Sequence, residues 1–400
     1  MITFDEAKIR DVADVKGGKR LPKGKQLLTT PNSHPYIRIR DLGKSKILEL
    51  NSDYEYVDSL TQESIKRYIV SEGDILISVV GTIGLIGIVG KSLHGANQTE
   101  NCDKITNLKR IDRDYLYYYL KSDMGQNEIK KGTVGAVQPK LPLKNVLDLK
   151  IKYPDIDTQR KIAKILNLID GKITINNEIN DNLHKQCSCL YDQLVEKAES
   201  GKLEDIIFAI ETGSRPKGGA EKSGIPSIGA EKIDKFGSYD YSTEKYINHE
   251  YFAKLKRGKI ESGDVMLYKD GAYTGKSSMC LDGFPHEKAA VNEHVFLIRS
   301  KNKQMQSFLY FSLQNDKIHQ SIYALACGKA AQPGLNQQEL LSVDCPIPAF
   351  DDILAFEKKV KPIMHQIALN ALQNRDLAKL RDSLLPKLMS GEIDVDSIEL

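Results

Sequence analysis

The fold of this chain is decided by two stretches, LNLIDGKITINNEIN at residues 166–180 and VKPIMHQIALNALQN at residues 360–374. Each belongs to a longer segment in which apolar residues recur at steps of three and four, the spacing of a coiled-coil seam. The second seam is the first displaced by 194 residues. The seam positions are Leu166, Ile169, Ile173, Asn176, Asn180, Leu183, Cys187, Leu190 and Leu194, and then Val360, Ile363, Ile367, Asn370, Asn374, Leu377, Arg381, Leu384 and Leu388. The pattern predicts two long helices, over residues 157–197 and 351–391.

Shorter phrases outside the seams repeat as well. Most have the same displacement of 194 residues, whereas Gly73-Asp-Ile-Leu76 resembles Gly263-Asp-Val-Met266 at a slightly different one. The pairs at the common displacement are Ile9-Arg-Asp-Val12 with Leu203-Glu-Asp-Ile206, Leu21-Pro-Lys-Gly24 with Arg215-Pro-Lys-Gly218, Gln138-Pro139 with Gln332-Pro333, and Pro154 with Pro348. Each half of the chain therefore has constant ends around a variable middle, the mark of an internal repeat.

The repeat predicts an α+β protein with pseudo-twofold internal symmetry. Two similar α/β globular domains are expected, separated by two long antiparallel coiled-coil helices. The predicted boundaries are 1–153 for the first globular domain, 154–199 for the first helix, 200–347 for the second globular domain, and 348–400 for the second helix with a C-terminal tail.

The antiparallel direction follows from the junctions between these parts. A compact domain of ~150 residues has a radius of gyration near ~15 Å, whereas a 40-residue helix is ~60 Å long. The second globular domain joins the end of one helix to the start of the other, so those two ends should be neighbours. Residues whose numbers sum to 550 should then face each other, namely Asn176 and Asn374, Asn180 and Asn370, Ile173 and Leu377, and Leu183 and Ile367. Asparagines in a seam are best explained by selection of register or partner, although each helix could instead pack only on its own globular domain.

Three residues of the second helix depart from a simple seam. Pro362 and Pro386 each remove a backbone hydrogen bond, and we expect a kink at both. Arg381 is expected to extend its charge out of the seam toward water. Gly391 provides a stop signal.

Composition indicates a globular protein without a membrane span. The chain is 40% hydrophobic, has a net charge of +3 and a mean hydropathy of -0.38, and no apolar run approaches the ~20 residues that a membrane helix needs. The opening MITFDEAKIRDVADV lacks the apolar core of a secretory signal. We therefore expect a cytoplasmic protein that does not contact a membrane.

The segments that resemble catalytic motifs have the wrong residue spacing or lie on the wrong kind of secondary structure. The glycines of Gly271-Ala-Tyr-Thr-Gly275-Lys276 are separated by three residues where a phosphate loop needs four, so a turn is the better interpretation. No dinucleotide-binding motif, adenine methyltransferase tetrapeptide or metal-binding histidine spacing occurs. Asp155, Asp170 and Lys172 imitate a nuclease cluster but belong to the predicted helix or its start. We expect no catalytic residue, cofactor site or metal site in this chain.

Features suited to binding nucleic acid remain. Two basic glycine-rich loops, Gly17–Lys25 and Gly213–Gly219, occupy corresponding places and could present cations to phosphates, or could be solvated turns. The segment Tyr36–Arg40 alternates like a strand, which would put Arg38 and Arg40 on one face. Polar side chains able to read base edges occur near residues 97 and 292. The candidates for DNA contact are Lys19, Arg20, Lys23, Lys25, Arg38, Arg40, Asn97, Gln98, Arg215, Lys217, Lys269, Lys276, Asn292 and His294.

The domain organisation and several short sequence motifs of this chain together resemble the specificity subunit of Type I restriction-modification systems. The matching phrases are Gly73-Asp-Ile-Leu76 with Gly81-Thr-Ile-Gly84, Gln138-Pro139, Pro154 leading to Gln159-Arg-Lys-Ile162, and Leu384-Leu-Pro-Lys-Leu-Met-Ser-Gly-Glu-Ile393. The second repeat departs where Asp351-Asp-Ile-Leu354 replaces the glutamine-bearing helix start, which puts partner contacts there in doubt.

The resemblance implies a non-catalytic subunit that binds double-stranded DNA. Each variable domain would be a target recognition domain for one half of an asymmetric bipartite site. The helices would hold the two domains apart and dock two methyltransferase subunits, which carry S-adenosylmethionine and methylate adenine. Restriction subunits would join the full complex. The alternative is a non-enzymatic assembly scaffold with two ligand-binding domains on an antiparallel coiled coil.

Overall fold

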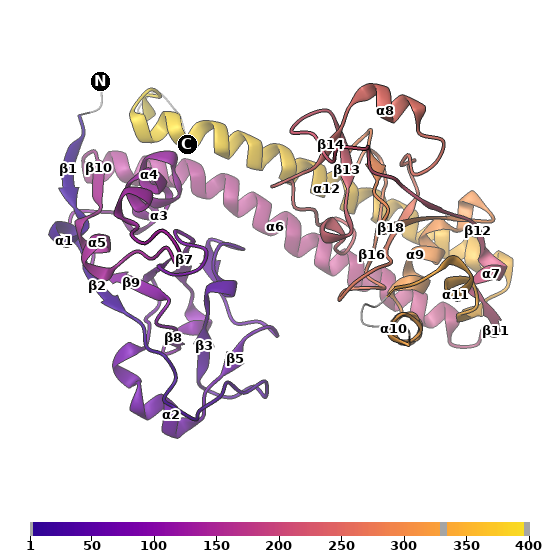
Figure 1. Cartoon of the computed structure of the whole chain (residues 1–400), viewed down its shortest axis with the longest axis horizontal. Helices are drawn as coiled ribbons and strands as arrows, with labels where there is room; N and C mark the ends of the chain where they lie inside the picture. The colour runs from indigo at the N-terminus through magenta and orange to yellow at the C-terminus, as the bar shows by residue number, and fades with distance from the viewer. Residues whose placement is uncertain (1–2, 329–333, 396–400) are drawn as a thin grey trace. The chain divides into compact units, whose positions relative to one another are not determined.

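The computed structural model describes residues 3–328 and 334–395 and divides into two compact units (Figure 1). Unit 1 comprises residues 1–171 and 378–400, and unit 2 comprises residues 172–377. Both long helices contribute to both units. The repeated phrase Gln332-Pro333 lies outside the described residues.

The globular part of unit 1 contains three small sheets. Their strand orders are β1-β10, β2-β9-β6-β7-β4 and β5-β3-β8. The strands are β1 (Asp5–Lys8), β2 (Asp14–Gly17), β3 (Pro35–Ile37), β4 (Ile47–Leu48), β5 (Glu55–Tyr56), β6 (Ile75–Ser78), β7 (Ile86–Val89), β8 (Asn97–Gln98), β9 (Cys102–Thr106) and β10 (Lys150–Tyr153). The short helices are α1 (Ile9–Val12), η1 (Ile39–Asp41), α2 (Ser59–Ser64), η2 (Lys66–Tyr68), η3 (Lys91–Leu93), α3 (Arg113–Lys121), α4 (Asp123–Gly132) and α5 (Leu143–Asp148).

The globular part of unit 2 also contains three small sheets, but the sheet that corresponds to β2-β9-β6-β7-β4 has four strands among the described residues. Its sheets have the orders β11-β19, β12-β18-β15-β16 and β14-β13-β17. The strands are β11 (Glu199–Lys202), β12 (Ile207–Thr212), β13 (Ile225–Ile228), β14 (Tyr246–Ile247), β15 (Val265–Tyr268), β16 (Ser277–Met279), β17 (Ala290–Val291), β18 (Val295–Ser300) and β19 (Asp344–Ile347). The short helices are α7 (Leu203–Ile206), η4 (Ala230–Lys232), α8 (His249–Lys254), η5 (Lys303–Met305), α9 (Gln306–Gln314), α10 (Asp316–Cys327) and α11 (Gln337–Leu341).

Corresponding strands of the two units pair in the same way. The first and last strands of each globular part form an antiparallel ribbon, β1 with β10 and β11 with β19. In the three-stranded sheets, β3 is parallel to β8 and antiparallel to β5, just as β13 is parallel to β17 and antiparallel to β14. The internal repeat predicted from the sequence is therefore confirmed as a repeat of topology.

The two long helices extend from Ile156 to Val195 (α6) and from Phe350 to Ser390 (α12), within two residues of the predicted ends. Within each unit, a segment of α6 lies alongside a segment of α12 (Figure 1). Helix α12 is assigned without interruption through both of its prolines. Gly391 follows it with a φ of 75°, the left-handed conformation that ends a helix.

The antiparallel register of the seam is confirmed within unit 2. Asn176 Nδ2 donates to Asn374 Oδ1 at 2.9 Å, and Asn370 Nδ2 donates to Asn180 Oδ1 at 2.8 Å. Both pairs have residue numbers that sum to 550, and the second number falls as the first rises. The facing of Ile173 with Leu377 stays a prediction.

Arg381 behaves differently from the expectation. Its NH1 donates to Asp170 Oδ1 at 2.9 Å within unit 1, and its side chain is 23% exposed. Burial alone would lower the pKa of Arg381, but the hydrogen bonds and charges of Asp170 and Asp382 raise it. The prediction that Arg381 extends into water was wrong, because a carboxylate on α6 compensates its charge inside the unit.

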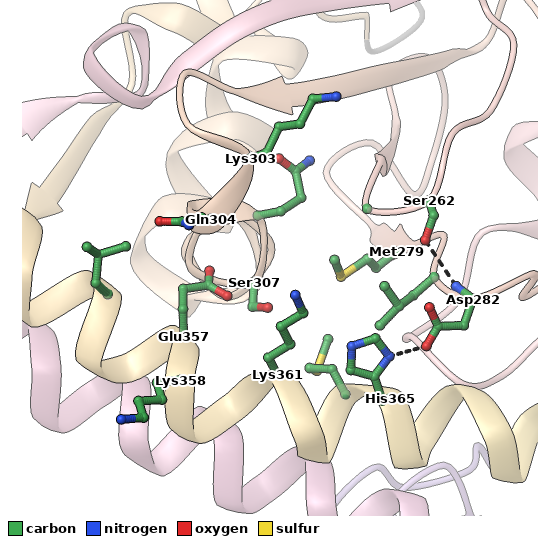
Figure 2. A pocket seen from close by; sticks show the side chains of 15 residues that line it. Ser262, Met279, Asp282, Lys303, Gln304, Ser307, Glu357, Lys358, Lys361 and His365 are labelled. Carbon is green, nitrogen blue, oxygen red and sulfur yellow. Dashed lines mark hydrogen bonds and ion pairs between the residues drawn. The ribbon is translucent and has the colours of Figure 1, made fainter.

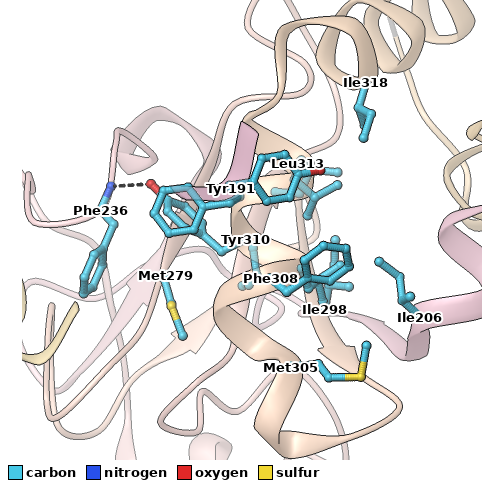
Figure 3. Packing of buried hydrophobic residues seen from close by; sticks show 14 of the residues in the cluster. Tyr191, Ile206, Phe236, Met279, Ile298, Met305, Phe308, Tyr310, Leu313 and Ile318 are labelled. Carbon is cyan, nitrogen blue, oxygen red and sulfur yellow. Dashed lines mark hydrogen bonds between the residues drawn. The ribbon is translucent and has the colours of Figure 1, made fainter. Parts of the chain in front are cut away.

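Each unit has its own apolar core, to which the long helices contribute. In unit 1, Ile162 and Leu166 of α6 and Leu388 of α12 join the sheet residues. In unit 2, Tyr191 of α6 packs among Phe308, Phe311 and Phe356. Figure 3 shows Tyr191 and Phe308 of this cluster, and also the Phe236 amide, which donates to the Tyr310 hydroxyl at 3.2 Å. Among the described residues, no helix combines the length and apolarity that crossing a membrane requires.

Candidate nucleic-acid interface

The two basic loops leave their sheets at glycines where a side chain would collide with the backbone of a neighbouring segment. A Cβ on Gly18 would lie 1.9 Å from the Thr99 carbonyl oxygen, and one on Gly213 would lie 1.5 Å from the Val291 carbonyl oxygen. The Gly213 amide also donates to Asn292 O at 3.2 Å. Close packing of the backbone therefore fixes the start of the loop at the same place in both repeats.

An arginine two residues beyond each glycine pairs with a glutamate of the same repeat. Arg20 Nε lies 2.5 Å from Glu100 Oε1, and Arg215 Nε lies 2.9 Å from Glu293 Oε1. Burial alone would raise the pKa of Glu100, but the hydrogen bond and charge of Arg20 lower it. We call Arg20–Glu100 and Arg215–Glu293 the common pair, because both repeats make it with the same polarity.

The lysines of the loops differ in their contacts. Lys19 lies over the Tyr68 ring, 5.7 Å from its centroid, and Lys25 pairs with Asp58 at 3.1 Å. Lys23 and Lys217 are exposed, and neither has an ion pair or hydrogen bond to another described residue. These two ammonium groups are available for phosphate contacts.

Arg38 and Arg40 are not on a strand, so that part of the prediction was wrong. Strand β3 ends at Ile37, and residues 39–41 form the 3-10 turn η1, because Asp41 Oδ2 accepts the Arg38 amide at 2.7 Å and turns the chain. The two guanidiniums nevertheless converge. Both pair with Glu55, Arg40 NH2 at 2.9 Å from its Oε2.

Asn97 and Gln98 are fully buried, which corrects their candidacy for base contact. Asn97 Nδ2 donates to Ile65 O at 3.3 Å, and Gln98 Nε2 donates to Cys102 O at 3.2 Å. In the described conformation neither amide can reach a base edge. Their polarity, which the sequence suggested for readout, is directed toward the backbone instead.

The candidates of the second repeat are divided between buried and exposed residues. Asn292 is buried, and its Oδ1 accepts the His294 amide at 2.9 Å, so it is also removed as a base contact. His294 is 43% exposed and its Nδ1 lies 3.2 Å from Asp270 Oδ2. Lys269 also pairs with Asp270, at 3.4 Å, and is mostly covered. Lys276 is exposed and lies over the Tyr273 ring, 4.7 Å from its centroid.

The glycine turns that imitate phosphate loops are turns in both repeats. Gly81 and Gly84 have φ values of 74° and 86°, and Gly271 and Gly275 have φ values of 122° and 100°. Left-handed backbone at these positions explains the glycines without a bound phosphate.

A pocket of about 600 Å³ in unit 2 lies between α12 and the globular part. Figure 2 shows Lys361 and His365 of α12 on one side and Ser262 and Asp282 on the other, with His365 Nδ1 paired to Asp282. Glu357, also at this pocket, is buried, which raises its pKa, and it accepts the Phe308 amide at 2.8 Å. This carboxylate holds the first turn of α9 against α12.

The equivalent attachment in unit 1 uses a different residue. Gln159 of α6 is 0% exposed, and its Oε1 accepts the Asp112 amide at 2.8 Å just before α3. Its Nε2 donates to Pro154 O at 2.8 Å. The second repeat lacks this glutamine, and Glu357, one helical turn farther along, supplies an acceptor there, which the sequence pattern alone did not indicate. Within the described residues, no group of three or more His, Cys, Asp or Glu is arranged to hold a metal ion.

Comparisons with known proteins agree with this organisation. Residues 1–185 match the family described as Type I restriction modification DNA specificity domain. The Type I restriction enzyme MjaIX specificity subunit of Methanocaldococcus jannaschii is 24% identical over 99% of this chain and 94% of its own length, and the MjaVIII specificity subunit of the same organism is 24% identical over 95% and 96%. The crystal structure of a Type-I restriction-modification system S subunit from M. genitalium has the same fold, with a TM-score of 0.56 and 16% identity over 97% of this chain and 96% of that chain. This chain is therefore similar over nearly its whole length to specificity subunits of Type I restriction-modification systems.

Proposed function

We propose that this chain recognises an asymmetric bipartite DNA target, one half-site per repeat, as the DNA-reading subunit of a Type I restriction-modification complex. One observation carries the proposal. Two repeats share a sheet topology and a basic loop with its common pair, yet differ in the side chains around that loop. A repeated frame with divergent surfaces suits two DNA segments that share a backbone but differ in sequence.

The basic loops supply affinity that does not depend on sequence. Lys23 and Lys217 are exposed and would neutralise phosphates, and the release of counterions makes such binding fall steeply with salt. Phosphate contacts fix where each repeat sits on the duplex. Base discrimination is then left to a few exposed polar side chains in each repeat.

The long helices supply the attachment for other subunits. We propose that α6 and α12 dock two methyltransferase subunits, which bind S-adenosylmethionine and methylate adenine, and that restriction subunits join this assembly. The apolar residues exposed on the helices support this role: Leu168, Ile175 and Ile179 of α6 and Leu369 and Leu380 of α12 are 39–57% exposed. The chain itself contributes recognition and no catalytic group, because flipping and methylating a base require the pocket of the partner.

The test is to co-express this chain with the methyltransferase subunit of its own system in a host free of that activity. Methylated adenines are then mapped across the host genome by single-molecule sequencing. We expect a gapped, asymmetric motif that disappears when this chain is omitted. Replacing residues 200–347 by those of a related specificity subunit should change one half of the motif and leave the other half intact.

Two outcomes would overturn the proposal. A palindromic motif without a gap contradicts one different half-site per repeat. A stable complex that neither binds nor methylates DNA contradicts recognition altogether.

A further inference from the structure

The two repeats can be aligned residue by residue from their backbone hydrogen bonds. Ile37 O accepts the Thr99 amide at 3.0 Å, and Ile228 O accepts the Asn292 amide at 3.0 Å. Ile37 and Ile228 also each end the central strand of a three-stranded sheet. The turns η1 and η4 begin two residues beyond these isoleucines, so Arg40 in the first repeat occupies the place of Glu231 in the second.

The neighbouring strand aligns independently. Tyr56 lies opposite Pro35, and Tyr246 lies opposite Pro226, two residues before the aligned isoleucines. Each tyrosine also exchanges two backbone hydrogen bonds with the segment leading into its sheet, Tyr56 with Leu28 and Tyr246 with Glu221. The residues just before the tyrosines therefore occupy one place, and they are Glu55 and Lys245.

These two places form an ion pair in both repeats, but with opposite polarity. In the first repeat Arg40 NH2 lies 2.9 Å from Glu55 Oε2. In the second repeat Lys245 Nζ lies 3.0 Å from Glu231 Oε1. We call Arg40–Glu55 and Lys245–Glu231 the reversed pair. Arg40, Glu231 and Lys245 are each about half exposed, at 49%, 51% and 49%.

The sign of the charge is also reversed at the next residue of the chain, but it is not reversed at the common pair. The residue after Arg40 is Asp41, and the residue after Glu231 is Lys232, which pairs with Asp240 at 2.8 Å. By contrast, the common pair has the same polarity in both repeats. Burial alone would raise the pKa of Glu231, but the hydrogen bond and charge of Lys245 and the charge of Arg215 lower it.

From this contrast we infer that the reversed pair determines the sequence specificity of each half-site, while the common pair serves the contact with the DNA backbone. The inference rests on the proposed function. Phosphates are the same in both half-sites, so a pair of constant polarity suits them, whereas bases differ and call for groups that differ.

The chemistry of each pair predicts which bases its half-site contains. A guanidinium has five N–H donors, so Arg40 and the adjacent Arg38 can each hold Glu55 and still offer donors to the O6 and N7 of guanine. Glu231 presents an acceptor for the N4 amino group of cytosine, and Lys245 presents a donor. We expect the half-site of the first repeat to contain guanine opposite Arg38 and Arg40, and that of the second repeat to be read by a group of opposite sign at the same place.

The double variant Arg40→Glu/Glu55→Lys tests this inference, because it gives the first repeat the polarity of the second while keeping an ion pair. Glu231→Arg/Lys245→Glu is the reciprocal change. Each would be assembled with the methyltransferase subunit and used to select from a random double-stranded DNA library and to methylate a genome. We expect each variant to change one half of the motif, a different half for each, with a preference for the original base lowered about 5- to 150-fold.

The matched control is Arg20→Glu/Glu100→Arg, which reverses the common pair. It should weaken binding to all sequences and leave the motif unchanged. Should a reversed variant fail to assemble, Arg40→Gln/Glu55→Gln removes both charges while keeping both side chains polar, and it should relax the preference at the same base pair.

Failures of the inference and of the proposed function are distinguishable. If the unaltered complex yields no gapped motif, the proposed function fails. If it yields one, but reversed and neutral variants methylate the same motif, the inference is wrong and the reversed pair is a structural ion pair only.

Discussion

Asn370 donates its side-chain amide to the side-chain oxygen of Asn180 at 2.8 Å inside the seam between α12 and α6. Both residues are more than nine-tenths buried, and Asn180 in turn donates to Ile367 O at 3.2 Å. A shift of one helix along the other would leave these amides facing apolar side chains. The pair therefore selects one register at a cost in stability.

Replacing one asparagine of this pair should lower the free energy of unfolding more than replacing both. Asn180→Leu leaves the Asn370 side-chain amide unpaired and removes a side-chain hydrogen bond to the Ile367 carbonyl, which should lower the free energy of unfolding by about 1–3 kcal/mol. Asn180→Leu/Asn370→Leu should recover most of this loss, because a matched apolar pair leaves fewer polar groups buried. Denaturant titrations of both single variants and the double variant measure the coupling, and additive effects would contradict the pairing.

His184 should make unit 2 sensitive to mild acid. Burial lowers its pKa to about 4, and its Nε2 contacts the Tyr310 hydroxyl at 2.8 Å. Because the folded-state pKa lies below the unfolded value of about 6.5, the unfolded chain binds the proton first as pH falls. Stability is complete above pH ~6.5 and should fall by up to about 3 kcal/mol as pH drops toward 4. His184→Gln, neutral at every pH, should lack this component when unfolding is compared at pH 7 and pH 4.5.

Asp103 should have the opposite dependence. It is 4% exposed in β9, and burial raises its pKa to about 6, above the unfolded value. Its contribution is present at low pH and is lost as pH rises through 6, when a buried carboxylate must ionise. Asp103→Asn should raise the free energy of unfolding at pH 7.5 by up to about 3 kcal/mol and change it little at pH 4. A stabilisation equal at both pH values would show that charge is not the cause.

Gln159 should be the residue on which the attachment of the first globular part to α6 depends most. It joins the Asp112 amide and the Pro154 carbonyl, and Gln159→Leu leaves both unpaired at about 1–3 kcal/mol each. The same substitution at Gln193, exposed on the same helix, is the control and should change stability by less than about 0.5 kcal/mol. Equal effects at the two positions would mean that the glutamine contacts contribute nothing.

The seam could be predicted from the sequence because its information is local and periodic. The spacing of apolar residues gave both helix ends within two residues, and the connectivity gave the direction that placed Asn176 beside Asn374. The end of α12 at Gly391 could be predicted equally well, because a residue in the left-handed conformation after a helix is usually glycine.

The candidate interface was less predictable, because it depends on contacts between distant residues. The strand expected at Arg38 ends early since the Asp41 side chain captures the Arg38 amide. Asn97 and Gln98 were candidates as polar residues, yet they satisfy backbone carbonyls in the interior.

The reversed pair could not be found from the sequence, because its residues are not separated by the displacement common to the repeated motifs. Arg40 and Glu231 are 191 residues apart and Glu55 and Lys245 are 190 apart, whereas most repeated phrases are 194 apart. Only the strand register shows that these residues correspond.

The two unpaired loop lysines should set much of the salt dependence of DNA binding. Removing one phosphate contact lowers the slope of log affinity against log salt by about 1, so Lys23→Ala/Lys217→Ala should lower it by about 2 and weaken cognate and unrelated sequences alike. Lys130→Ala/Lys301→Ala removes the same charge from one exposed lysine in each unit and serves as the control. Binding of the assembled complex to cognate and scrambled duplexes, measured between ~50 and ~200 mM salt, gives both slopes. A loss confined to the cognate duplex would mean that these lysines read bases, and an unchanged slope would mean that the loops do not reach the backbone.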